Sequence, residues 1–142
     1  MSVENEKKAQ EIYTEFQVVE QHINQLQKQL EVVTHQLLEL NATSNALDEF
    51  DKITVSKEIF VPLSSGIFAK ADIKDTSELL VNVGANVVVK KDVATTKKLI
   101  EKQMEEIKRI QKQMIQELEN MTHHAANLEM QLQSLISEGK SS

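Results

Sequence analysis

The segment from Ile59 to Val89 reads IFVPLSSGIFAKADIKDTSELLVNVGANVVV, and its apolar residues recur at every second position. A period of two places these side chains on one face of a β-strand. Ser64-Ser65-Gly66 predicts a three-residue hairpin loop, Lys74 to Ser77 a polar connection, and Gly84-Ala85 a two-residue turn. We therefore expect two consecutive β-hairpins. Their shared apolar face is predicted to carry Ile59, Val61, Leu63, Ile67, Ala69, Ala71, Ile73, Leu79, Val81, Val83, Val87 and Val89.

The even positions of the same segment form a second, smaller apolar set, made up of Phe60, Phe68, Leu80 and Val88. A short sheet attached to a thin helical hairpin cannot bury both of its faces, and it leaves strand edges unpaired. Pro62 has no N–H to donate to a neighbouring strand, so it belongs near a strand end or on an edge. We expect other chains to complete the sheet.

The sequences on both sides of this segment have apolar residues at alternating steps of three and four, a pattern typical of coiled coils. Each stripe predicts a helix of roughly 43 residues, about 65 Å long at the usual rise per residue. Ser44, Lys97 and Gln111 are the polar exceptions. The N-terminal stripe contains Ala9, Ile12, Phe16, Val19, Ile23, Leu26, Leu30, Val33, Leu37, Leu40, Ser44 and Leu47. The C-terminal stripe contains Val93, Lys97, Ile100, Met104, Ile107, Gln111, Met114, Leu118, Met121, Ala125, Leu128, Leu132 and Leu135.

Two helices of equal length on either side of a β segment favour an antiparallel pair. The predicted register pairs Leu47 with Val93, Leu40 with Ile100, Leu37 with Met104, Val33 with Ile107, Ile23 with Leu118 and Phe16 with Ala125. It also brings Ser44 opposite Lys97, so that two polar positions meet. Gln111 lies opposite Leu30 without a polar partner, which would fix the register at some cost in stability. The alternative is that each helix dimerises with a helix of another chain.

The sequence thus predicts an α+β protein, mainly α, in which a long antiparallel helical hairpin carries two central β-hairpins. We expect a single domain over residues 1–142. Its parts are a coiled-coil helix at 1–50, the β-hairpins for assembly at 51–91, a second coiled-coil helix at 92–138 and a disordered tail at 139–142.

The formal net charge of −6 and the absence of a basic face disfavour nucleic-acid binding. The chain has no cysteine, so disulfides and thiolate metal chemistry are excluded. Its start lacks the apolar region of a signal peptide, and no apolar run approaches the roughly 20 residues of a membrane span. We expect a cytoplasmic protein that does not bind a membrane.

Residues suited to catalysis do not converge anywhere in the sequence. His22 and His35 have no ligand partner at metal-binding spacing, and His123 and His124 point to different sides of a helix. The Gly84-Ala85-Asn86 string is not a phosphate-binding loop, because a strand follows it. We therefore predict no catalytic residue, cofactor or metal site, and no enzyme activity.

Some apolar residues lie off the two stripes near the chain ends: Met1, Val3, Tyr13, Met130 and Ile136. In an antiparallel hairpin these residues meet at the free end. Exposed, flexible apolar side chains are typical of surfaces that bind many partners. The alternative interpretation is that frayed helix ends carry stray apolar residues.

Taken together, the heptads, the V-P-L-S-S-G turn at Val61 to Gly66 and the V-G-A-N-V-V-V-K-K run at Val83 to Lys91 resemble alpha-type subunits of prefoldin. The likeness covers essentially the whole chain, and two hairpins instead of one separate the alpha type from the beta type. The short tail after Leu135 and the simple composition look more archaeal than eukaryotic.

The resemblance implies a hexamer of two alpha-type and four beta-type subunits, in which the hairpins form multi-subunit β-barrels. It also implies a chaperone that captures unfolded or nascent polypeptides without ATP and delivers them to a group II chaperonin. The implied client-binding residues are Met1, Val3, Tyr13, Leu128, Met130, Leu132, Leu135 and Ile136. The implied assembly residues are Ile59, Phe60, Val61, Leu63, Ile67, Phe68, Leu79, Val81, Val83, Val87 and Val89. The alternative function is that of a structural or tethering coiled coil whose sheet only forms oligomers.

Overall fold

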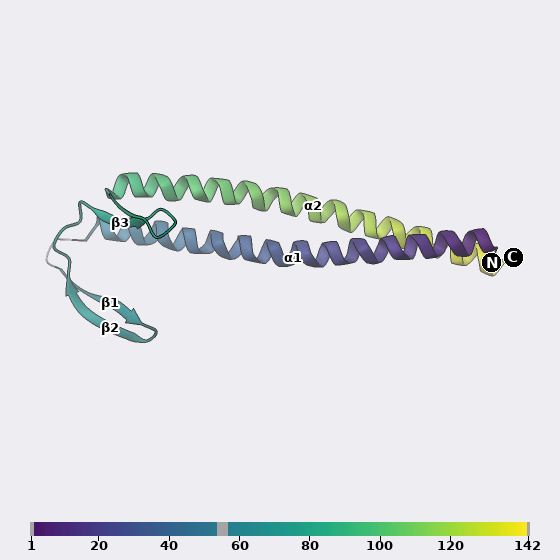
Figure 1. Ribbon diagram of the computed structural model, residues 1–142, viewed down its shortest axis with the longest axis horizontal. Coiled ribbons are helices and arrows are strands. Elements are labelled where there is room, and N and C mark those ends of the chain that lie inside the picture. The colour runs from purple at the N-terminus through teal and green to yellow at the C-terminus, as the bar shows by residue number, and fades with distance from the viewer. Residues whose placement is uncertain (1, 54–56, 142) are drawn as a thin grey trace. The chain divides into compact units, whose positions relative to one another are not determined.

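The computed structural model describes residues 2–53 and 57–141, and it consists of two long helices and two small sheets (Figure 1). This confirms the prediction of an α+β protein that is mainly α. In chain order the elements are α1 (Val3–Asp51), β1 (Glu58–Ser64), β2 (Ile67–Asp72), β3 (Leu79–Asn82), β4 (Val88–Lys91) and α2 (Val93–Ser141).

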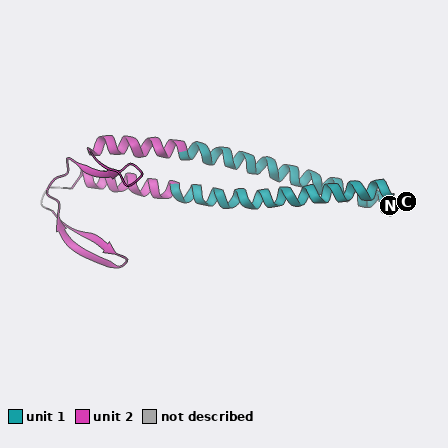
Figure 2. Ribbon diagram, viewed as in Figure 1, with its two compact units in different colours: residues 1–36, 107–142 teal, residues 37–106 magenta. Residues whose placement is uncertain are grey.

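The chain divides into two compact units, which Figure 2 shows in different colours. Unit 1 contains residues 1–36 and 107–142, and therefore both ends of the chain. Unit 2 contains residues 37–106, and therefore both β-hairpins.

The predicted heptad stripes are the buried faces of α1 and α2. Every position of both stripes is buried or half-buried, whereas nearly all residues between them are exposed. The most buried apolar side chains belong to the stripes: Leu26, Val33, Leu47, Val93 and Leu128. No side chain in the described residues is fully enclosed, as expected for two helices that share one seam.

Within unit 1 the helices run antiparallel, because α1 contacts progressively earlier residues of α2. His124 Nε2 lies 3.1 Å from Glu15 Oε1, and Gln111 Nε2 donates a hydrogen bond of 3.1 Å to Thr34 Oγ1. Gln111 therefore has a polar partner, so the prediction that it lacks one is wrong. Its long side chain reaches past the seam to the threonine that follows Val33.

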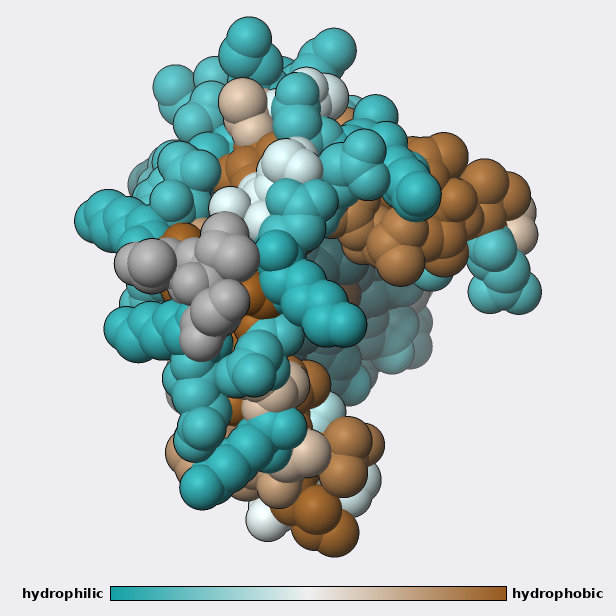
Figure 3. Space-filling view, turned by 90° about the vertical axis from the view of Figure 1, so that its left-hand side faces the viewer, coloured by the Kyte–Doolittle hydropathy of each residue, from teal (hydrophilic) through white to brown (hydrophobic). Residues whose placement is uncertain are grey.

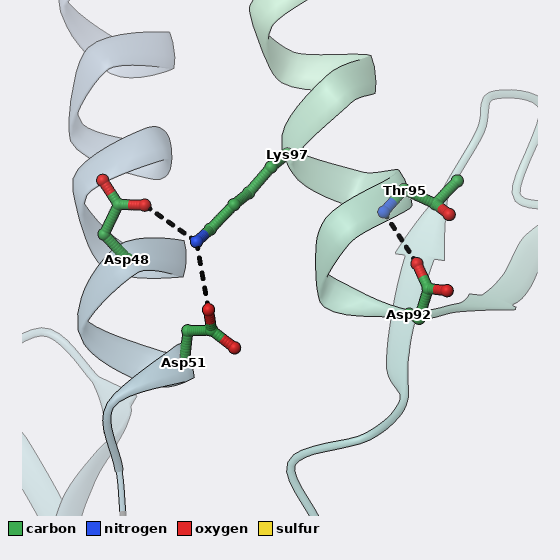
Figure 4. A network of polar contacts seen from close by, with 5 residues as sticks. All are labelled: Asp48, Asp51, Asp92, Thr95 and Lys97. Carbon is green, nitrogen blue, oxygen red and sulfur yellow. Dashed lines mark hydrogen bonds and ion pairs between the residues drawn. The ribbon is translucent and has the colours of Figure 1, made fainter.

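Within unit 2, Lys97 bridges the two helices at their junction with the hairpins. Its Nζ lies 2.9 Å from Asp48 Oδ1 and 3.3 Å from Asp51 Oδ2 (Figure 4). Lys97 thus reaches about one helical turn beyond Ser44, the partner that the register predicted. The hydrogen bond that Lys97 donates to Asp48 raises the pKa of Lys97 most, desolvation opposes this effect, and the hydrogen bond to Asp51 adds to it.

Two polar residues cap the helices at their N-termini. Ser2 Oγ accepts a hydrogen bond from the Asn5 N–H before the first turn of α1. Asp92 Oδ1 accepts one of 2.7 Å from the Thr95 N–H before α2 (Figure 4). Hydrogen bonding with the Thr95 side chain, and then with its backbone N–H, lowers the pKa of Asp92.

Helix α2 continues through Ser141, so the prediction of a disordered tail is wrong for residues 139–141. A glycine inside a helix costs only about 1 kcal/mol relative to alanine, and Gly139 is too weak a signal to end the helix. The predicted tail residue Ser142 lies outside the described residues.

The first hairpin pairs β1 with β2 in antiparallel register from Glu58 opposite Asp72 to Pro62 opposite Phe68. The next pair is Ser64 opposite Ile67, so β1 contains one extra residue and forms a bulge. The loop between the strands is therefore Ser65-Gly66, which is one residue shorter than the predicted three-residue loop. Gly66 has a φ of 78°, which glycine adopts without strain.

The second hairpin pairs β3 with β4, and its turn is centred one residue later than predicted. Ala85 and Asn86 have φ values of 51° and 60°, and the Val87 N–H donates to the Gly84 carbonyl. Positive φ at both central residues defines a type I′ turn. Both predicted hairpins are therefore confirmed, but they form separate two-stranded sheets rather than one sheet with a shared face.

Candidate functional site

Large apolar side chains are exposed on both β-hairpins of unit 2. Figure 3 shows hydrophobic side chains, in brown, at the surface that it draws. The exposed residues of the predicted assembly set are Phe60, Val61, Leu63, Ile67, Phe68, Val83 and Val87, and Leu80 and Val88 are exposed as well. A two-stranded sheet has no second layer to cover these residues, so they form a candidate interaction surface.

The remaining assembly residues are half-buried: Ile59, Leu79, Val81 and Val89. In the first hairpin the register places Ala71 opposite Ile59 and Ala69 opposite Val61 on one face. Phe60 and Phe68, which are 63% and 59% exposed, lie on the other face.

The second candidate surface lies at the chain ends in unit 1. Val3 and Met130 are 82% and 68% exposed, and Tyr13 and Ile136 are 50% and 40% exposed. We call these four residues the exposed tip set. Gln17 Nε2 donates a hydrogen bond to Tyr13 Oη, so the phenol has a partner on its own helix.

Three other residues predicted at this site lie in the helix seam. Leu128 is only 4% exposed and is one of the most buried side chains, while Leu132 and Leu135 are half-buried. The prediction that Leu128 belongs to an open binding surface is therefore wrong, because its position in the heptad places it between the helices. Met1, which was also predicted, lies outside the described residues.

Four exposed apolar side chains on the helices were not predicted from the sequence: Val18, Val32, Leu38 and Ile115. Each of them lies off the predicted stripes, and this position is the signal that could have identified them. They are spread over both helices and form no stripe of their own. They therefore serve as controls for the exposed tip set.

The polar residues of the described chain do not assemble into a reactive centre. No group of three or more possible ligands gathers around a metal site among residues 2–53 and 57–141. In the same residues no buried polar side-chain atom lacks a hydrogen-bond partner. Of the histidines, His124 faces Glu15, and His22 borders a shallow groove with Glu117 and Met121. Among the described helices, none is long and apolar enough to cross a membrane.

Comparison with known proteins identifies relatives over nearly the whole chain. A family model described as prefoldin subunit matches residues 19–138. The chain is 29% identical over 133 residues to prefoldin subunit alpha of Methanobrevibacter smithii, which covers 94% of this chain and 90% of the relative. It is 27% identical over 128 residues to prefoldin subunit alpha of Archaeoglobus fulgidus, which covers 90% of this chain and 93% of the relative.

The fold also matches a solved structure. The cryo-EM structure of filamentous PFD from Methanocaldococcus jannaschii superposes with a TM-score of 0.67 at 17% identity, covering 87% of this chain and 96% of the other. At that identity the likeness supports the fold alone. The family model, however, covers most of the chain and agrees with the named relatives. The chain therefore belongs to the prefoldin family, as a chaperone subunit of the alpha type rather than an enzyme.

Proposed function

We propose that the chain joins beta-type prefoldin subunits in a hexamer of two alpha-type and four beta-type subunits. In this hexamer the exposed tip set contacts non-native polypeptides without ATP, and a group II chaperonin receives them. The observation that supports this proposal is that large apolar side chains are exposed on both hairpins of unit 2 and, as the exposed tip set, near the chain ends in unit 1. A cytoplasmic location, as expected from the sequence, belongs to the same proposal.

Weak contacts suffice for capture when several subunits act on one client. An exposed methionine or valine contributes little binding energy alone, but linked sites raise the overall affinity through a high effective concentration. Release then needs no nucleotide, because each contact breaks easily. The net charge of −6 favours solubility of the loaded complex.

The proposal is tested by mixing the chain with beta-type subunits. Native mass spectrometry should show a complex of two alpha-type and four beta-type chains. Light scattering should then show that the complex slows aggregation of a denatured client diluted into buffer without ATP. If the hexamer forms and the client aggregates as fast as in buffer alone, the chain is a structural or tethering coiled coil instead.

Matched variants locate the client contacts. Val3→Ser, Met130→Ser and Ile136→Ser together should leave the hexamer intact and weaken protection of the client several-fold. Val18→Ser and Val32→Ser remove valines of similar exposure, 57% and 58%, from the outside of α1 and serve as the control. Equal loss of protection in both sets would refute the assignment to the tip.

Delivery is tested separately with a fluorescent client bound to the hexamer. Addition of a group II chaperonin should move the label to the chaperonin fraction in size-exclusion chromatography. A label that stays with the hexamer, at chaperonin concentrations that bind the free client, would refute delivery and leave capture unaffected.

A further inference from the structure

A groove between α1 and α2 lies within unit 1, and the apolar residues that line it come from both helices. Phe16 and Ile23 of α1 are half-buried there, and they face Ala125 and Ala126 of α2 across the groove. Two successive alanines have no side-chain atoms beyond Cβ, so they leave a volume of about 450 Å³ beside the seam. The other lining residues are polar. A volume of this size is in the range of ligand-binding clefts, and we call it the side groove.

The charged residues that line the side groove are both acidic. Glu20 of α1 and Glu129 of α2 are exposed carboxylates. Neither has a lysine or arginine three or four residues away on its own helix, where ion pairs within a helix form. The ion pairs among the described residues do not involve them either. The side groove therefore offers two carboxylates that no cation of the described chain neutralises.

The sequence on both sides of the side groove also lacks basic residues. Residues 9–27 and 113–131 contain six acidic residues and no lysine or arginine. The remaining 16 of the 22 acidic residues equal the 16 lysines and arginines of the chain in number. The whole net charge of −6 therefore belongs to these two ranges, which both lie in unit 1. A ligand with positive charge is attracted to this part of the molecule, and an acidic ligand is repelled.

We propose that the side groove binds segments of non-native polypeptide in which a lysine or arginine stands next to an apolar residue. This inference rests on the proposed function, because it specifies which clients the subunit prefers. Lysine and arginine place their methylene groups along apolar surface and keep the charged end in water. In the side groove the methylene groups lie along Phe16 and Ile23, and the charged end reaches Glu20 and Glu129. The exposed tip set has no charged member, so it does not select clients by charge.

Two short, unfolded, fluorescently labelled peptides test this preference. They share the same apolar and serine residues, and one of them has lysines where the other has glutamines. Fluorescence anisotropy should show that the full chain binds the lysine peptide about fivefold more tightly, as two exposed ion pairs of ordinary strength allow. The preference should disappear in 1 M salt, which screens exposed charges. The hexamer should show the same preference when light scattering compares its protection of a basic and an acidic client.

Two double variants of equal net charge separate the side groove from the general negative charge of unit 1. Glu20→Gln with Glu129→Gln should abolish the preference for the lysine peptide and leave binding of the glutamine peptide unchanged. Glu117→Gln with Glu119→Gln removes the same charge from outside the side groove and should keep the preference. All four glutamates are exposed on helices, so both variants should fold. Ala126→Lys places a cation in the side groove and should also abolish the preference.

Three results would decide against the side groove or against the proposed function. Equal affinity of the unsubstituted chain for both peptides, or an equal loss of preference in both double variants, overturns the inference and leaves capture by the exposed tip set unaffected. Unchanged peptide binding by Glu20→Gln with Glu129→Gln, together with a loss of transfer to the chaperonin, also overturns it, because the side groove then serves the chaperonin. If the full chain prefers the lysine peptide but the hexamer protects no client, the proposed function fails and the side groove remains a binding site.

Discussion

Two adjacent residues, Ala85 and Asn86, have left-handed backbone conformations in the turn of the second hairpin. Asparagine tolerates this conformation, but alanine is strained there by about 1 kcal/mol because its Cβ crowds the following carbonyl. The Asn82 side chain accepts a hydrogen bond from the Gly84 N–H and supports the entry to the turn. The sequence suggested a turn at Gly84-Ala85 because glycine is the usual signal, but the strand register moves the centre by one residue.

Replacing Ala85-Asn86 by Asn-Gly should stabilise the hairpin, since this dipeptide is favoured in type I′ turns. Relief of about 1 kcal/mol corresponds to roughly fivefold slower exchange of the Val83 and Val87 amides, which bond across the turn. Ala85→Val is the control and should speed exchange, because a β-branched residue is more strained at positive φ. Faster exchange in the Asn-Gly variant would contradict the turn assignment.

The stability that the Asp92 cap gives to the start of α2 should depend on pH. Its pKa is lowered by the hydrogen bond from Thr95, so its cap stabilises the folded chain fully above the ordinary value of 3.8. This stabilisation should disappear as the pH falls through the lowered value. Asp92→Asn keeps a good cap that does not titrate, whereas Asp92→Ala removes the cap at every pH. Urea midpoints at pH 7 and below pH 3 should therefore distinguish wild type, Asp92→Asn and Asp92→Ala. An equal loss of stability on acidification in wild type and in Asp92→Asn would contradict the role of the Asp92 carboxylate as a cap.

At the level of elements, the helices were predictable and the details of the hairpins were not. A heptad stripe contains many apolar positions, and each of them predicts the same helix and the same buried face. A single polar residue such as Ser44 therefore does not change the prediction. A hairpin turn depends on one or two residues. At Leu63 a single extra residue changed the loop, and period alone contains no signal for that bulge.

The contacts of long side chains could not be predicted from the sequence either. Heptad positions predict which Cα atoms oppose each other, but Lys97 and Gln111 reach about one turn away from their opposite positions. The last turn of α1 contains no basic residue of its own, although it holds Asp48 and Asp51. Lys97 supplies the missing positive charge from α2, near the negative end of the α1 dipole.

Asp48→Asn should therefore lower the stability of the hairpin relative to Glu49→Gln. Both substitutions remove a carboxylate near the end of α1, but only Asp48 contacts Lys97. The difference between their urea midpoints should shrink in 1 M salt, which screens exposed pairs. A midpoint for Asp48→Asn at or above that of Glu49→Gln would show that the bridge does not stabilise the junction.

The same bridge predicts a dependence on high pH. The pKa of Lys97 is raised in the folded chain, so its contribution is complete below the ordinary value of 10.5 and is lost as the pH rises through the raised value. Between pH 10 and pH 12 the wild-type midpoint should fall more than that of Lys97→Met. Parallel curves for the two proteins would mean that other lysines account for the loss.

For the whole molecule, the sequence predicted both candidate surfaces but could not separate exposed from buried residues within the tip. Leu128 and Met130 are both apolar, two residues apart and near the chain end. Leu128 lies in the seam and Met130 in solvent, at 4% and 68% exposure. The heptad position, rather than hydrophobicity or nearness to the terminus, determines the difference.

This contrast gives a prediction that separates stability from client capture. Leu128→Ala should destabilise the chain by about 2–4 kcal/mol, because it leaves a cavity between the helices. Met130→Ala should change stability by less than about 0.5 kcal/mol, because the side chain is exposed, yet reduce client protection by the hexamer. Urea unfolding of the free chain and light scattering with the hexamer, at a temperature where all variants are folded, measure the two effects. If Leu128→Ala left stability unchanged and Met130→Ala lowered it, the register of the seam at the tip would have to be shifted.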